Sequence, residues 1–239
     1  MVFPLKEEET GALNTWSRDI AASYPDITGF GSLHAQTPRK DEVTERCMVE
    51  YGLAGMKLHP YVQLFEAFSP VFEPMYRKLS ELRRPFVVHT GFDIFYRQTQ
   101  DLDYLRGVLE RYPDMPVVLV HSLFPRFELA YELMGQHPQL YIDMTNAVSA
   151  VRWYKESPEN WVDITEGENI AANLEHFEPL IEEYSSRVMF GTDHPAGMGS
   201  PGQIYSDLEW FGFSPGINAD LLGRTARSFL EAHCGPVQP

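Results

Sequence analysis

The chain has 239 residues, which is enough to bury a sizeable hydrophobic core in one large domain or two small ones. Its 34 Asp and Glu residues against 19 Lys and Arg give a formal net charge of −15, so we expect no nucleic-acid partner. Two cysteines argue against a disulfide framework, and no long apolar run predicts a signal peptide or a membrane span. These features predict a cytoplasmic protein with no membrane partner.

Six short runs rich in Val, Ile, Leu and Phe recur along the chain, and each ends in a polar residue. They cover residues 27–34, 55–59, 85–89, 116–121, 140–143 and 188–193, and the last residue is His in the first four and Asp in the last two. Segments with helical periodicity lie before and between them, at residues 11–23, 41–51, 71–83, 101–112, 126–136, 170–185 and 219–233.

Alternating strands and helices of this length predict a parallel α/β sheet with right-handed crossovers. We therefore expect a TIM-barrel-like (β/α) fold that forms a single domain over residues 1–239. In a parallel sheet all carboxyl-terminal strand ends emerge on one face, so the six polar residues are predicted to gather there. Barrel enzymes carry their chemistry on that face.

Three of the strand-end residues are candidate metal ligands, namely His89, His121 and Asp193. Imidazole nitrogen and carboxylate oxygen suit a divalent ion such as zinc, with manganese also possible. A bound ion would activate water and polarise a carbonyl group. Asp193 and His121 are also candidate catalytic residues, since Asp193 could act as a general base. The alternative for Asp193 is a capping role at the following turn.

Other residues near the strand ends are candidate substrate-binding groups. Lys57 and His59 are two apart on one strand and point to the same face, where Lys57 could bind an anionic group, bridge metals as a carbamate, or pair with a carboxylate. His34 and Asp143 could shape the pocket or fix loops by hydrogen bonds. Arg97 could bind a substrate carboxylate.

Arg126, like Arg97, could either bind a substrate carboxylate or be a solvated helix residue. The solvated role is favoured for both arginines.

Residues 146–168 are long for a connection after a strand and are rich in Trp, Tyr and carboxylates. Such a segment predicts either a lid over the site or a surface helix packed by its aromatic residues.

The order of these motifs resembles the amidohydrolase-related family, which includes aromatic-acid decarboxylases and many TIM-barrel hydrolases. The resemblance covers roughly residues 15–232 and rests on YPDITGFGS at 24–32, GMKLHP at 55–60, VHTG at 88–91, VHS at 120–122 and FGTDHP at 190–195. It implies that His89 is the metal-ligand histidine of the fifth strand, and that His121 is the sixth-strand histidine, which binds metal or contacts substrate depending on the member. It implies that Asp193 is the eighth-strand Asp, a metal ligand and proton shuttle.

The resemblance has one departure, because the family's first strand carries a His-x-His pair and this sequence contains none. The motifs correspond to strands three to eight, so the predicted barrel is incomplete at its N-terminus. A shortened chain start, a second copy or partner that covers the gap, and a diverged open sheet are three readings of this departure. Unpaired sheet edges would favour a homo-oligomer.

Three functions follow as hypotheses for this chain. The first is a metal-dependent hydrolase of a small molecule, in which metal-activated water attacks an ester, lactone or amide carbonyl. The second is a non-oxidative decarboxylase, which protonates a ring carbon as carbon dioxide leaves. The third is a degenerate, non-catalytic barrel, which the missing His-x-His pair favours.

Overall fold

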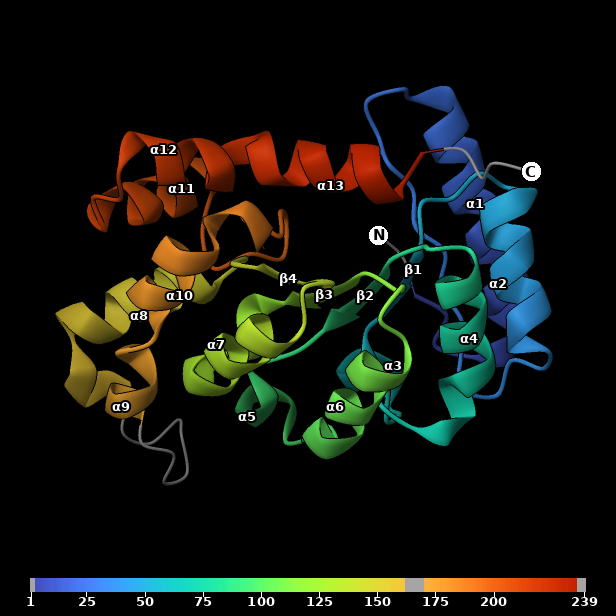
Figure 1. Cartoon of the computed structure of the whole chain (residues 1–239), viewed down its shortest axis with the longest axis horizontal. Coiled ribbons are helices and arrows are strands. Elements are labelled where there is room, and N and C mark those ends of the chain that lie inside the picture. The colour runs from blue at the N-terminus through green and yellow to red at the C-terminus, as the bar shows by residue number, and fades with distance from the viewer. Residues whose placement is uncertain (1–2, 162–169, 236–239) are drawn as a thin grey trace. The chain divides into compact units, whose positions relative to one another are not determined.

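The structure is a computed structural model that describes residues 3–161 and 170–235 (Figure 1). The chain forms two compact units. The first consists of Met1–His89, Thr99–Val118 and Phe229–Pro239, and the second of Thr90–Gln98 and Leu119–Ser228. The single domain over residues 1–239 stays a prediction.

The first unit contains strands β1 and β2, which are parallel and pair Met56 with Phe86 and Leu58 with Val88. Both strands are buried along their whole length. The strands and helices of this unit are β1 (Met56–Leu58), β2 (Phe86–His89), α1 (Thr10–Ser23), α2 (Lys40–Val49), α3 (Pro60–Gln63), α4 (Glu73–Glu81) and α6 (Leu102–Arg111).

The second unit contains β4 and β5, which are also parallel and pair Ile142 with Val188. Strand β3 (Val117–Val120) begins in the first unit and ends in the second, and α13 (Thr225–His233) begins in the second and ends in the first. The elements of this unit are β4 (Leu140–Asp143), β5 (Val188–Met189), α5 (Asp93–Tyr96), α7 (Phe127–Gln136), α8 (Ala147–Glu156), α9 (Ile170–Leu174), α10 (Phe177–Tyr184), α11 (Pro201–Trp210), α12 (Pro215–Ala219) and a π-helical segment (Asp220–Arg224).

Five strands lie in the described residues, in the order β1-β2-β3-β4-β5, so strands that follow one another in sequence are neighbours in the sheet. Helices separate them along the chain (Figure 1). This arrangement confirms the predicted parallel α/β fold.

The first predicted strand, residues 27–34, lies beside β1 but contributes only a bridge between Gly31 and Met56. Close packing explains why glycine stands here, because a Cβ on Gly31 would come within 2.9 Å of the Met56 sulfur and 3.0 Å of the Cys47 sulfur. The segment therefore approaches α2 and β1 too closely for a side chain at this point.

The outer edge of this segment is covered by α1 through the side chain of Asn14. Its Nδ2 donates to the Ser32 carbonyl oxygen at 2.9 Å, and its Oδ1 accepts from the Ser32 backbone N–H at 2.8 Å. Asn14 is buried. The amide thus makes the two bonds that a neighbouring strand would make, which protects the edge against pairing at this residue.

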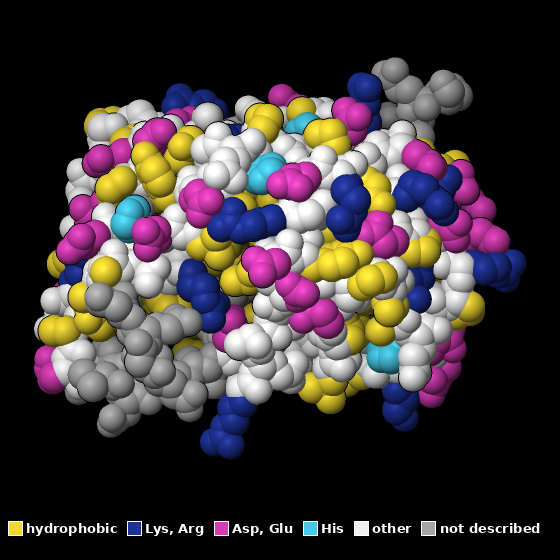
Figure 2. All heavy atoms as spheres, turned by 60° about the horizontal axis from the view of Figure 1, so that its bottom comes forward, with side chains coloured by type: hydrophobic (Ala, Val, Ile, Leu, Met, Phe, Trp, Pro, Cys, Tyr) yellow, Lys and Arg dark blue, Asp and Glu magenta, His cyan; other side chains and the backbone are white. Residues whose placement is uncertain are grey.

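Most predicted helices are present within a few residues of their expected bounds, as α1, α2, α4, α6 and α7 show. The helix predicted over residues 170–185 is divided into α9 and α10. Helix α11 was not predicted. No helix among the described residues is long and apolar enough to span a membrane. On the face shown in Figure 2, acidic and basic side chains are interspersed.

Candidate active site

In the first unit, the ends of β1 and β2 place two predicted site histidines together. The rings of His59 and His89 are stacked, with centroids 3.7 Å apart, and Tyr61 lies edge-on to His89 at 5.4 Å. Nδ1 of His59 accepts from the Val62 backbone N–H at 3.4 Å, which fixes its ring at the start of α3. Lys57, one residue before the end of β1, is also buried.

His34 lies in the first unit, where its Nδ1 accepts from the Gln36 backbone N–H at 3.2 Å. Its ring is edge-on to Phe65, with centroids 6.0 Å apart. These contacts support the turn after residues 27–34. A substrate-binding role for His34 stays a prediction.

In the second unit, His121 follows β3 and is buried. Its Nδ1 lies 2.7 Å from the Thr145 carbonyl oxygen. A carbonyl oxygen only accepts, so Nδ1 carries the hydrogen and Nε2 is the unprotonated nitrogen of the neutral ring. Such a bond orients a histidine for metal binding or proton transfer through Nε2. The Phe92 ring stands edge-on to this imidazole at 5.5 Å.

Asp193 follows β5 and is exposed. Its Oδ2 accepts from Nδ2 of Asn146 at 3.3 Å. Asn146 comes directly after Thr145, so two adjacent residues after β4 contact His121 and Asp193. We call residues 143–146 the β4 turn. It brings two of the predicted catalytic residues to one short segment of the second unit.

The β4 turn is held by a hydrogen bond between two of its own residues and by close packing against Gly191, which follows β5. Oδ1 of Asp143 accepts from the Thr145 backbone N–H at 2.6 Å. Gly191 lies against the turn, because a Cβ there would be 2.1 Å from Oγ1 of Thr145 and 3.3 Å from the Asp143 carboxylate oxygens. Asp143 therefore shapes the turn by hydrogen bonding.

Strained backbone follows each of the strands β2 to β5. Non-glycine residues there have left-handed φ angles, among them Phe92 (55°), His121 (65°) with the next two residues, Asn146 (61°) and Asp193 (52°). Each costs about 1–3 kcal/mol, and such residues cluster at functional sites. The strain therefore marks the same segments that carry the predicted catalytic groups.

The two arginines after the strand ends differ in their surroundings. Nη1 of Arg126 is 2.8 Å from Oδ2 of Asp93, and both side chains are largely buried. The favoured interpretation of Arg126 as a solvated helix residue is thus wrong, because this ion pair withdraws it from solvent. Arg97 is exposed and has a left-handed φ of 52°. Its role as a substrate-binding residue stays a prediction.

Tyr96, in α5, is a site residue that the sequence did not reveal. Burial and the nearby carboxylate of Asp193 raise the pKa of Tyr96 above its usual value. The phenol therefore stays protonated at neutral pH and can donate a hydrogen bond. Asn146 and Thr145 were also missed, although both directly follow a predicted strand end, the position that singled out the histidines.

The segment predicted as a lid, residues 146–168, begins with α8. The first five residues of this helix are buried, so its amino-terminal half is a packed element. Residues 162–168 of the predicted lid lie outside the described residues. The lid stays a prediction.

The donor chemistry of the second unit fits a divalent cation, because Nε2 of His121 and the Asp193 carboxylate are ligands that zinc and manganese accept. Within residues 3–161 and 170–235 no group of three or more His, Cys, Asp or Glu side chains is placed to hold a metal ion together. The ligand set of His89, His121 and Asp193 stays a prediction.

Comparisons with known proteins give a family match and similar folds for this chain. The sequence model described as Amidohydrolase matches residues 5–231. A comparison with curated proteins gives no match. The structure is similar to an uncharacterised TIM-barrel protein from Bordetella bronchiseptica, with a TM-score of 0.65 and 20% identity, over 93% of this chain and 73% of that one.

Two decarboxylases have a similar fold. One is 5-carboxyvanillate decarboxylase from Sphingomonas paucimobilis, with a TM-score of 0.63 and 15% identity, over 95% of this chain and 74% of that one. The other is 5-carboxyvanillate decarboxylase from Novosphingobium aromaticivorans, complexed with manganese and 4-hydroxy-3-methoxy-5-nitrobenzoic acid. Its TM-score is 0.61 at 13% identity, over 94% of this chain and 70% of that one. At these identities the likeness shows the fold.

Proposed function

Because the chain belongs to the amidohydrolase family, we propose that it is a metal-dependent enzyme that decarboxylates a hydroxylated aromatic acid without an oxidant. The observation that carries the proposal is the β4 turn, which contacts His121 through Thr145 and Asp193 through Asn146. The turn thus contacts both the imidazole of His121, whose Nε2 carries the lone pair, and the carboxylate of Asp193. The activity of two similar structures, both 5-carboxyvanillate decarboxylases, suggests the reaction class.

In the second unit, His121 and Asp193 are the residues that would hold the metal, and a ligand role for His89, which lies in the first unit, stays a prediction. A bound cation would supply positive charge that orients and polarises the substrate carboxylate and hydroxyl groups. Zinc suits the nitrogen and carboxylate donors, and manganese, which a similar decarboxylase holds, is the second choice.

Asp193 is the residue proposed to move the proton. In the reaction the bond between the ring carbon and the carboxylate breaks, carbon dioxide leaves, and the ring carbon takes up one proton. Asp193, which is exposed, would first take up a proton from solvent and then deliver it to the ring carbon from Oδ1, because Oδ2 accepts the hydrogen bond of Asn146. Burial and this carboxylate raise the pKa of Tyr96, so its phenol is protonated at neutral pH.

Aromatic side chains pack around His121 in the second unit. Phe92 stands edge-on to His121, and it stacks on Phe124 at 4.4 Å. Both Phe92 and Phe124 are buried. Edge-on and stacked rings attract one another, so these contacts help to hold the His121 ring in place.

Hydrolysis of an ester, lactone or amide is the second candidate. The observation in its favour is the exposure of Asp193, which lets its carboxylate accept a proton from water. In that reaction Asp193 would take a proton from a water molecule while the water oxygen attacks the carbonyl carbon. The C–O or C–N bond to the leaving group then breaks, and the leaving group takes up that proton.

The test is to incubate the protein with Mn²⁺ or Zn²⁺ and a panel of hydroxylated benzoic acids, including 5-carboxyvanillate, and to measure carbon dioxide and the product phenol. We expect decarboxylation by the wild type and a loss of about 10²–10⁴-fold in kcat for Asp193→Asn. Asp103→Asn, an exposed acidic residue of α6, is the matched control and should keep full activity.

Different outcomes would separate the candidates. Inertness toward the acids together with cleavage of an ester or lactone panel would replace decarboxylation by hydrolysis. A folded, metal-loaded protein that turns over neither panel would contradict both reactions and favour the non-catalytic barrel. Circular dichroism shows whether each variant is folded.

A further inference from the structure

Asn146 uses both ends of its side-chain amide within the second unit. Its Nδ2 donates to Oδ2 of Asp193 at 3.3 Å, and its Oδ1 accepts from the Met198 backbone N–H at 2.9 Å. The residue is buried, at 8% exposure. Only an amide side chain offers a donor and an acceptor in this arrangement, so Asp could replace one of these bonds but not both.

Asn146 immediately precedes α8, where an asparagine usually caps the helix. A capping side chain accepts from the backbone N–H groups of the first turn, and Asn146 makes no such bond. Its φ of 61° is left-handed, a conformation that asparagine tolerates better than most residues. The side chain is therefore directed to Asp193 and Met198 rather than to its own helix.

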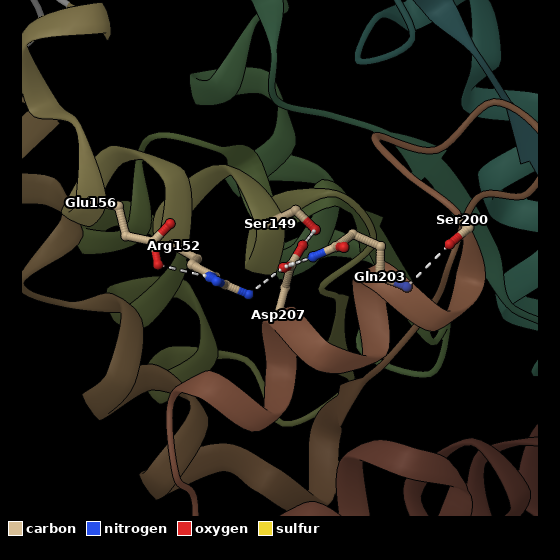
Figure 3. Close-up of polar contacts among 6 residues, drawn as sticks. All are labelled: Ser149, Arg152, Glu156, Ser200, Gln203 and Asp207. Carbon is tan, nitrogen blue, oxygen red and sulfur yellow. Dashed lines mark hydrogen bonds and ion pairs between the residues drawn. The ribbon is translucent and has the colours of Figure 1, made fainter.

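The segment between β5 and α11 is attached to α8 at a second place. Figure 3 shows Asp207 of α11 facing Ser149 and Arg152 of α8. The Asp207 carboxylate accepts from Oγ of Ser149 at 2.5 Å and from Nη1 of Arg152 at 2.8 Å, and it is fully buried. Helix α11 is thus fixed against α8. The segment that leads from β5 to α11 is therefore anchored where it joins the start of α11.

Gln203 completes this attachment at the first turn of α11. Its side chain donates to Asp207 at 2.9 Å, and its backbone N–H donates to Oγ of Ser200 at 3.2 Å (Figure 3). The loop from Asp193 to Ser200 is therefore held by Asn146 at Asp193 and at Met198, and by α11 at its far end. Helix α8 supports both attachments.

We propose that Asn146 is a positioning residue for Asp193, which fixes both the carboxylate and the loop that carries it. The proposal rests on the proposed function in so far as Asp193 is the residue that moves the proton. The two bonds of the amide have separate effects: the bond to Met198 holds the loop, and the bond to Oδ2 orients the carboxylate so that Oδ1 faces the reaction.

Two variants separate these effects. Asn146→Gly removes both bonds and suits the left-handed φ, so the fold is kept. Asn146→Asp keeps an acceptor for the Met198 N–H but replaces the donor to Asp193 by a second carboxylate. Ser149→Ala is the matched control, because it removes one bond of the attachment between α8 and α11 and leaves Asn146 unchanged.

The first readout is hydrogen exchange at the Met198 amide, which needs no substrate. We expect exchange to become about tenfold faster or more in Asn146→Gly and to stay slow in Asn146→Asp and in Ser149→Ala. Unchanged exchange in Asn146→Gly would overturn the proposal. This readout tests the proposal even where the wild type is inert toward every acid of the panel, in which case only the proposed function fails.

The second readout is the split between kcat and KM for an acid that the wild type decarboxylates. We expect Asn146→Asp and Asn146→Gly to lose about 10²-fold in kcat with little change in KM, because a displaced carboxylate affects the proton transfer. Asn146→Gln keeps the amide and should recover part of kcat, and Ser149→Ala should keep it. A normal kcat in Asn146→Asp would show that the bond to Asp193 has no positioning role.

Discussion

The ring of His59 lies on the ring of His89, with centroids 3.7 Å apart and planes 17° from parallel. Both side chains are buried, and His59 is fixed by the N–H of Val62. Two positively charged rings at this separation would repel each other, so the contact suits neutral imidazoles, the form that binds metal ions. His59 thereby supports the orientation of His89.

The first prediction separates the two members of this pair. His89→Ala should lower the affinity for Zn²⁺ or Mn²⁺ by at least about tenfold, because it removes a predicted ligand. His59→Phe should keep both the stacking and the metal, since a ring remains on His89. Elemental analysis after dialysis measures bound metal, and thermal unfolding checks the fold. Equal losses of metal in both variants would instead make His59 a ligand.

The second prediction concerns Gly191, which lies against the β4 turn. In Gly191→Ala the new Cβ would come within 2.1 Å of Oγ1 of Thr145, so the Thr145 side chain or the turn itself must move. We expect a loss of stability of about 1–3 kcal/mol and a loss of activity of about 10²-fold, because the turn contacts both His121 and Asp193. Urea unfolding and decarboxylation assays measure the two effects.

Gly202→Ala is the control for this substitution. A Cβ on Gly202 would meet only Oγ of Ser200, at 4.0 Å, so the helix α11 accepts it without displacement. Stability and activity should stay close to those of the wild type. If Gly191→Ala also behaved like the wild type, the packing of the β4 turn would not matter for the site.

The polar residues after the strands could be predicted because their positions depend on a local pattern. Apolar runs that end in His or Asp identify β2, β3 and β4 within about one residue, since burial on both faces requires continuous hydrophobic sequence. The first run did not become a full strand, because the close approach of Gly31 to Met56 is a tertiary feature.

The connections within the candidate site could not be predicted in the same way. The carbonyl of Thr145 and the amide of Asn146 contact residues that lie 24 and 47 positions away in the sequence. The pairing of Arg126 with Asp93 spans 33 positions. Such contacts depend on how strands are placed side by side, and local periodicity carries no information about them.

The third prediction tests how α1 protects the sheet edge. Asn14→Ala would leave the N–H and the carbonyl of Ser32 buried without the partners that Asn14 now supplies. We expect a loss of about 2–4 kcal/mol in the free energy of unfolding, measured by urea denaturation, since each buried group loses a hydrogen bond. The exposed edge should also promote self-association, which light scattering detects.

Gly11→Ala on the same helix is the matched control for Asn14→Ala. A Cβ on Gly11 would meet nothing within 4 Å, and alanine favours a helix over glycine by about 1 kcal/mol. This variant should be as stable as the wild type or slightly more stable, and it should not associate. Self-association of Gly11→Ala would show that α1 in general, rather than the Asn14 amide, controls the edge.

The last prediction concerns Glu73 at the start of α4, whose carboxylate accepts from Tyr104 and Arg111 at 2.6 Å each, and from Tyr112. Burial alone would raise the pKa of Glu73, but these hydrogen bonds lower it below its usual value. A carboxyl group with a lowered pKa in the folded state stabilises the protein above the unfolded-state pKa. That contribution is lost as the pH falls through the lowered pKa.

Glu73→Gln should therefore cost about 1–2 kcal/mol in the free energy of unfolding at neutral pH, measured by urea denaturation. The difference between this variant and the wild type should shrink as the pH falls below about 4.3, the usual glutamate value. Glu110→Gln, an exposed position on α6, is the control and should change little at any pH. A difference that stays constant down to acidic pH would show that the charge of Glu73 does not stabilise the fold, and that the shape of its side chain alone accounts for the loss.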